Sequence, residues 1–199
     1  MTNKIYISLG WRCESAVRRA NVYNLRKPNY ETCIFDLMVT NLEGIIKCIN
    51  DDFSNLFNPK YLICKEKSLL MNTYYKFGFN HETPGAEKLP GIKWPLNEDK
   101  NYYVKNNFEK FKERYTKRLE NFKKYIKEND HIVFILERVN SKKNVLLEKL
   151  KNVLKKKYPK KKFSFDIFYS EKDGGIKLHE LNMKALKLTE DERKLELNL

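Results

Sequence analysis

The sequence has few of the residues that build metal, phosphate or membrane sites. Among its 199 residues are three histidines, seven glycines and four cysteines. The cysteines have no close paired spacing, which argues against a zinc knuckle and for reduced thiols. There is no glycine-rich phosphate loop and no internal repeat, and no apolar run approaches the length of a membrane span. We therefore expect no metal, no cofactor and no membrane span. All four cysteines lie in the first third of the chain, so one disulfide pair stays open.

Length and composition indicate a globular protein. An apolar fraction of 41% can fill a core, so global disorder is not expected. We expect one α/β domain over residues 1–199, with 170–199 as an alternative peripheral tail. The N-terminus reaches a strand-like segment at once, without a basic region followed by an apolar one. The expected location is therefore the cytoplasm, which would be the host cytoplasm for a viral protein.

The charge is strongly positive, at +14. Such a charge favours an anionic partner: nucleic acid, a phosphate group or a membrane surface. The alternative is that the lysines form ordinary solvated surface, as AT-rich coding would give. Lysine outnumbers arginine, whereas bidentate phosphate recognition favours arginine. The lysine runs at 155–157 and 160–162 allow both interpretations.

Helical and strand patterns alternate along the chain, which predicts a layered α/β fold with a mostly parallel central sheet flanked by helices. The expected strands are at 5–9, 61–64, 69–79, 131–136 and 163–169, with an edge strand at 176–181. The expected helices start at 13, at 40 or 41, at 99 and at 140 or 141, and the last three end near 50, 129 and 157. Gly174 and Gly175 predict a turn.

An irregular loop is expected near 83–95. This stretch holds three of the six prolines and two of the seven glycines. Such loops lie at the surface and often carry function. We therefore interpret it as a lid or as the rim of a substrate site.

One cysteine lies where a reactive thiol is expected. The apolar run at 5–9 is followed by Gly10, and helical spacing starts at Cys13, so the chain changes there from strand to turn to helix. A helix N-terminus favours negative charge and lowers the pKa of a thiol. The turn also places Cys13 at the carboxyl end of a strand, where open α/β sheets bind ligands. The alternative is that Cys13 is a small buried apolar residue.

The histidines and one arginine are further candidates. His81 follows a predicted strand beside the proline-rich loop, so both a functional and a structural role are open. His131 opens the most apolar strand and favours a structural role. Arg138, at the carboxyl end of that strand, could hold a substrate carboxylate or phosphate, or form a salt bridge with Glu137 or another neighbour.

Several short elements occur in an order that resembles a known family. They are Ser8-Leu9-Gly10-Trp11-Arg12-Cys13, Phe35-Asp36, Asp51-Asp52-Phe53, His81-Glu82, the pair Arg114 and Arg118, and the apolar strand 132–138 that ends in arginine. Together they resemble a family of bacterial and viral proteins described as putative papain-like cysteine peptidases, whose pattern opens with S-L-G-x-x-C after a strand. The chain lacks the proline and tryptophan that flank Phe-Asp in the family, and it has glutamate where the family has H-D.

The resemblance implies a thiol nucleophile, a histidine base and an orienting acid. Matched by position, these are Cys13, His81, and Asp36 or Glu82; His179 is the reserve candidate for the base. In such a site the histidine takes the thiol proton while an acid fixes its ring. Backbone N–H groups around residues 11–14 would stabilise an oxyanion. Residues that would bind substrate or an anion are Gly10, Trp11, Arg12 and Arg138.

The leading hypothesis is therefore a cysteine-dependent hydrolase or acyl transferase acting on a peptide or acyl group. Two alternatives stay open. The first is a basic module that binds nucleic acid or another polyanion without catalysis, with Cys13 merely packed. The second is a protein that processes phosphate groups or glycans, holding an anion at the turn from Gly10 to Cys13 with help from Arg138.

Overall fold

The computed structural model describes residues 3–64, 70–82, 103, 105–139, 144–169 and 172–197. The loop expected near 83–95 and the expected helix start at 99 lie outside the described residues. No helix within the described ranges is both long enough and apolar enough to span a membrane.

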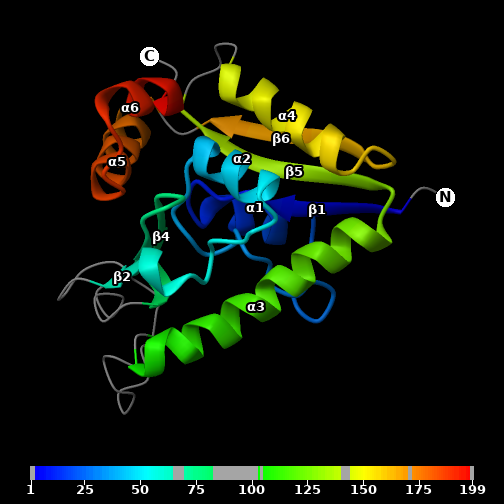
Figure 1. Cartoon of the computed structure of the whole chain (residues 1–199). Helices are drawn as coiled ribbons and strands as arrows, with labels where there is room; N and C mark the ends of the chain where they lie inside the picture. The colour runs from blue at the N-terminus through cyan, green and yellow to red at the C-terminus, as the bar shows by residue number, and fades with distance from the viewer. Residues whose placement is uncertain are drawn as a thin grey trace.

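A parallel sheet of three strands organises the fold (Figure 1). Strands β1 (Lys4–Ser8) and β6 (Lys162–Tyr169) both pair in parallel with β5 (His131–Arg138), which lies between them. All β5 residues after His131 are buried, as expected for a parallel strand that is covered on both faces. The predicted α/β architecture with a parallel central sheet is confirmed.

Four helices connect or cover these strands. They are α1 (Glu14–Val22), α2 (Leu42–Asn50), α3 (Lys105–Glu128) and α4 (Val145–Lys157). Helix α1 packs against β1 and β5, and α2 packs against α4. Asparagine side chains cap two of them: Asn41 accepts the N–H of Gly44, and Asn144 accepts that of Leu146. Such caps satisfy backbone donors that the first helical turn leaves without partners.

The single strand expected over 69–79 is wrong. The chain instead forms β3 (Leu70–Asn72), a turn and β4 (Phe77–Phe79). The turn forms because the Asn72 side-chain oxygen accepts the N–H groups of Tyr74 and Tyr75 at 3.0 and 2.9 Å, which mimics a backbone turn. With β2 (Leu62–Cys64), these strands make a small antiparallel sheet. Short 3-10 helices, η1 (Pro59–Tyr61) and η2 (Asn80–Glu82), precede and follow it.

The end of the chain also differs from the prediction. The edge strand expected at 176–181 and the turn at 174–175 are wrong, because both lie in helix α5 (Lys172–Ala185). Helix α6 (Glu190–Leu197) follows. In Figure 1 the two helices lie beyond the carboxyl ends of the parallel strands. Met183, Leu186, Leu188 and Leu197 join Trp11 in a second buried cluster, and burial of these side chains outweighs the weak local strand signal.

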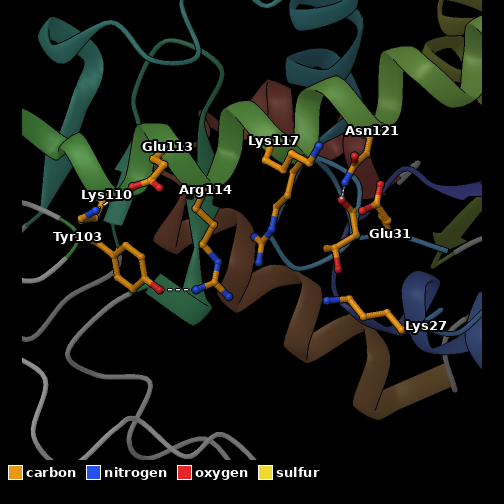
Figure 2. Close-up of a pocket in the computed structure, with 10 residues that line it drawn as sticks. Lys27, Glu31, Tyr103, Lys110, Glu113, Arg114, Lys117 and Asn121 are labelled. Carbon is orange, nitrogen blue, oxygen red and sulfur yellow. Dashed lines mark hydrogen bonds and ion pairs between the residues drawn. The ribbon is translucent and has the colours of Figure 1, made fainter.

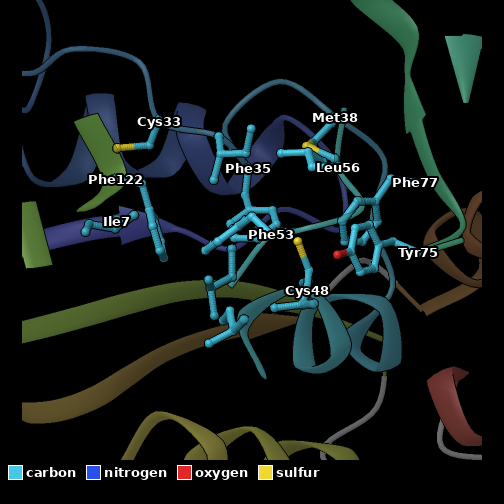
Figure 3. Packing of buried hydrophobic residues seen from close by; sticks show 14 of the residues in the cluster. Ile7, Cys33, Phe35, Met38, Cys48, Phe53, Leu56, Tyr75, Phe77 and Phe122 are labelled. Carbon is cyan, nitrogen blue, oxygen red and sulfur yellow. The ribbon is translucent and has the colours of Figure 1, made fainter. Parts of the chain in front are cut away.

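The main core lies between the sheet and the helices and is rich in aromatic side chains (Figure 3). Phe35 lies at its centre and contacts the rings of Phe53, Phe77 and Phe122, with centroids 5.6 to 6.2 Å apart. Edge-to-face pairs such as Phe35 with Phe122 are favourable beyond their buried area. This packing fixes the segment that carries Asp36.

Candidate active site

The turn after β1 has a backbone conformation that few residue types adopt without strain. Gly10 has φ +81° and Trp11 φ +71°. A side chain at Gly10 would place its Cβ 2.7 Å from the Thr40 hydroxyl and 3.2 Å from the Phe35 carbonyl oxygen, so glycine is required there. The Gly10 N–H donates to the Ser8 hydroxyl at 3.1 Å, and the Trp11 N–H donates to the Thr40 hydroxyl at 2.8 Å. These two amide groups are therefore occupied within the protein.

Cys13 lies at the N-cap position of α1 and is half-buried. Burial raises the pKa of its thiol to about 11, and the neighbouring Glu14 carboxylate, 3.5 Å from Sγ, adds to the increase. The expected low pKa is therefore wrong for this arrangement. Desolvation and a nearby negative charge both disfavour the thiolate, and they outweigh the opposing effects of Arg12 and a backbone hydrogen bond.

Replacing Glu14 with glutamine should lower the pKa of Cys13, because it removes the adjacent negative charge. At pH 8 the thiolate fraction, and with it the rate of alkylation by iodoacetamide, should rise on the order of tenfold for each unit of pKa lost. The rate is followed by mass spectrometry of the Cys13 peptide. Glu43→Gln, in the first turn of α2, is the matched control and should leave the rate unchanged. An equal rate in Glu14→Gln and wild type would show that the carboxylate does not affect the thiol.

His81 lies in η2, directly after the small sheet, and is also half-buried. Burial lowers the pKa of its imidazole, Glu82 raises it, and Arg118 and Arg114 lower it further. The ring is therefore neutral near pH 7, as a general base must be. Cys13 and His81 form no hydrogen bond with each other.

One segment nevertheless connects the two residues. The Thr40 N–H donates to the Trp11 carbonyl at 3.2 Å, which fixes the turn two residues before Cys13. The adjacent Val39 exchanges two backbone hydrogen bonds with Gly78, three residues before His81, at 2.8 and 2.9 Å. The fold therefore holds the Cys13 turn and the strand leading to His81 on either side of residues 39–40.

Asp36 and Glu82, the two candidate acids, are both buried and bind arginines. Asp36 accepts from Arg19 at 2.6 Å and from the Cys33 N–H at 2.7 Å. One oxygen of Glu82 accepts from Arg118 at 3.3 Å and lies 3.4 Å from Arg114. The Tyr115 hydroxyl also donates to this Glu82 oxygen, at 3.4 Å. No hydrogen bond joins either carboxylate to the His81 ring.

A second polar cluster lies at the carboxyl ends of β1 and β5. Arg12 forms a two-point ion pair with Glu137, with Nε to Oε2 at 3.1 Å. Glu137 also lies 3.7 Å from Nε2 of His179, which is fully buried in α5 with its ring 4.4 Å from that of Trp11. Burial lowers the pKa of His179, and Glu137 partly opposes the decrease. Arg12 and His179 were predicted as site residues, but no local sequence pattern indicated Glu137 as their shared partner.

Arg138 is buried and is bound by the end of the chain. Its guanidinium lies 3.8 Å from the Glu196 carboxylate and 4.5 Å from the centre of the Trp11 ring. Burial lowers the pKa of Arg138 to about 10. The Glu196 carboxylate also accepts the N–H groups of Leu42 and Glu43 at the start of α2. No local sequence pattern indicated Glu196 as the partner of Arg138, because the two residues are 58 positions apart.

The fold and the site together define an α/β protein with a cysteine at a strand–turn–helix junction on the carboxyl edge of a parallel sheet. The family model described as "Putative papain-like cysteine peptidase (DUF1796)" matches residues 4–170. The chain belongs to this family, as the order of its motifs predicted. Cys13, His81, Asp36 and Glu82 lie inside the matched range, and His179 lies beyond it. No curated protein and no solved structure matched the chain.

Within the described ranges, no three histidine, cysteine, aspartate or glutamate side chains are grouped so that they could hold a metal ion.

Proposed function

We propose that this protein is a cysteine-dependent hydrolase that cleaves a peptide or another acyl compound, with Cys13 as the nucleophile. The observation that carries the proposal is the position of Cys13, half-buried at the first turn of α1 and at the carboxyl edge of the sheet. Family membership supports the same class of chemistry. The free thiols of Cys13, Cys33 and Cys48 are consistent with a cytoplasmic setting, where thiols stay reduced.

The reaction would start from the neutral thiol. A base takes the proton from Sγ as sulfur attacks the carbonyl carbon, and the same proton passes to the leaving group when the acyl bond breaks. Water then hydrolyses the resulting thioester and regenerates the thiol. Because the amides of Gly10 and Trp11 already donate to hydroxyls, the donors for the developing oxyanion would be the N–H groups of Cys13 and Glu14 at the start of α1.

We propose His81 as the base. It lies within the matched range, is half-buried rather than fully buried, and has a lowered pKa that keeps its ring neutral near pH 7. Glu82 would act on it as the acid by its negative potential, since Glu82 raises the pKa of His81. Asp36 would support the site by holding Arg19 under the turn. Because Cys13 and His81 are not hydrogen-bonded, the proposal requires them to close on each other when substrate binds.

Variants of the two histidines test this assignment. His81→Gln should lower the rate of p-nitrophenyl acetate hydrolysis by about 10²- to 10⁴-fold, the usual contribution of a general base. The wild-type rate should rise with pH through the pKa of His81, which lies below the ordinary value of 6.5, and His81→Gln should lose this step. The measurements are the pH–rate profile and, as a check of folding, the melting temperature.

His179→Gln is the matched control, because it removes the other imidazole near the sheet edge. If His81 is the base, the His179→Gln variant should keep the rise in rate with pH that the wild type shows. If only His179→Gln loses this rise, the general base is His179 and not His81. A profile unchanged in both variants would refute the proposed Cys–His chemistry.

A further inference from the structure

A polar cavity lies along helix α3, apart from the Cys13 turn. Its volume is about 460 Å³, within the range of small-molecule sites. It is lined by residues from α3, from the segment 27–32 and by Tyr103, namely Lys27, Glu31, Thr32, Tyr103, Lys110, Glu113, Arg114, Lys117, Arg118 and Asn121. Figure 2 shows Arg114 and Lys117 extending from α3, and Lys27 facing them from the other side.

The lining of this cavity carries an excess of positive charge. Among the described residues that line it, five are cationic and two are carboxylates. One of those carboxylates, Glu113, is bound at 2.9 Å by Lys110. Glu82, behind the cavity wall, is shared between Arg114 and Arg118 through a single oxygen. Even with Glu82 included, cations outnumber carboxylates by five to three.

The two arginines are held in place before any ligand arrives. Arg118 is 5% exposed, and its guanidinium lies 4.5 Å from the centre of the Tyr115 ring. Arg114 donates to the Tyr103 hydroxyl, as the dashed line in Figure 2 shows. Contacts of 3.3 to 3.4 Å to one Glu82 oxygen are long for charge-assisted hydrogen bonds. Two like charges are therefore fixed side by side around a single oxygen of Glu82, which favours a further anion.

We propose that this cavity binds a small ligand through a phosphate group. A phosphate dianion matches the excess of positive charge, and its several oxygens can accept from more than one guanidinium at once. Lys27, on the opposite wall, and Thr32, which also lines the cavity, supply additional donors. The site is a concave cavity rather than an extended track, so the geometry favours a small phosphomonoester over a nucleic-acid strand. This proposal does not depend on the chemistry of Cys13.

Calorimetric titration with inorganic phosphate and with ribose 5-phosphate, at constant ionic strength, tests the proposal. The wild-type protein should bind one equivalent of each. Arg114→Gln should weaken binding by about tenfold or more, because it removes a charge-assisted hydrogen bond to the phosphate. Lys117→Gln, whose side chain is 66% exposed, should also weaken binding without a risk to folding.

Lys124→Gln is the matched control, because Lys124 is exposed on the same helix and does not line the cavity. It should leave the affinity unchanged. Absence of saturable binding in the wild type, or equal affinity in wild type, Arg114→Gln and Lys117→Gln, would overturn the proposal. So would tight binding of a single-stranded oligonucleotide that Lys117→Gln and Lys124→Gln weaken alike, because that result would indicate a diffuse basic surface.

Discussion

Cys13→Ser should lower the rate of p-nitrophenyl acetate hydrolysis by about a thousandfold or more, and should abolish formation of a thioester intermediate. The reason is that a serine hydroxyl is a much weaker nucleophile than a thiol and has no comparable route to its anion in this site. The acyl-enzyme is detected by intact mass spectrometry after rapid quenching. Wild-type protein should gain the mass of one acetyl group, located on the Cys13 peptide.

Cys64→Ser is the matched control for this experiment, because Cys64 is also half-buried and burial also raises the pKa of its thiol. It should keep the wild-type rate and the acetylated intermediate. Burial alone would then be excluded as the source of reactivity. Full activity of the Cys13→Ser protein would rule out the cysteine hydrolase and leave the basic surface as the main functional feature.

The second large effect concerns stability. Arg19 and Asp36 form a buried ion pair at 2.6 Å, with side chains 9% and 1% exposed. Asp36→Asn should lower the free energy of unfolding by about 3–5 kcal/mol, because it leaves the Arg19 guanidinium buried without its counter-charge. For a chain of this size the melting temperature should fall on the order of 10 °C. Chemical denaturation and calorimetry measure the two quantities.

Two controls separate this effect from others. Glu148→Gln removes one partner of an exposed pair with Lys151, 2.8 Å apart, and should cost less than about 1 kcal/mol. The double variant Arg19→Met with Asp36→Leu should recover much of the lost stability, because no buried charge remains. A cost below about 1 kcal/mol for Asp36→Asn would contradict the buried-pair account. Loss of hydrolysis in a stable Asp36→Asn protein would instead favour Asp36 as the orienting acid.

The parts of the fold that local pattern controls could be predicted from the sequence. The apolar run at 131–136 is buried on both faces, so its residues alone indicate the central strand. The heptad-like spacing of Phe111, Tyr115 and Phe122 likewise indicates the buried face of α3. The local pattern gave a wrong prediction where tertiary contacts determine the secondary structure. Residues 176–181 look strand-like, but they form part of α5, where His179 contacts the Trp11 ring and Met183 is buried in the same cluster.

The site could be predicted only in part, for the same reason. Gly10 and Cys13 mark the strand–turn–helix junction, which local sequence controls. The pKa of the Cys13 thiol could not be predicted in this way, since it depends on burial and on the orientation of the Glu14 side chain. Pairs such as Arg12 with Glu137, which are 125 residues apart, have no local signal at all. Their formation follows from the order β1-β5 in the sheet.

Helices α5 and α6 lie beyond the range that the family model matches, yet they supply Glu196 to Arg138 and to the start of α2. A fragment cut after residue 170 would retain every family motif but would open the indole of Trp11 to water and leave a buried guanidinium without its carboxylate. The range that the family model matches is therefore smaller than the set of residues that bury Trp11 and pair with Arg138.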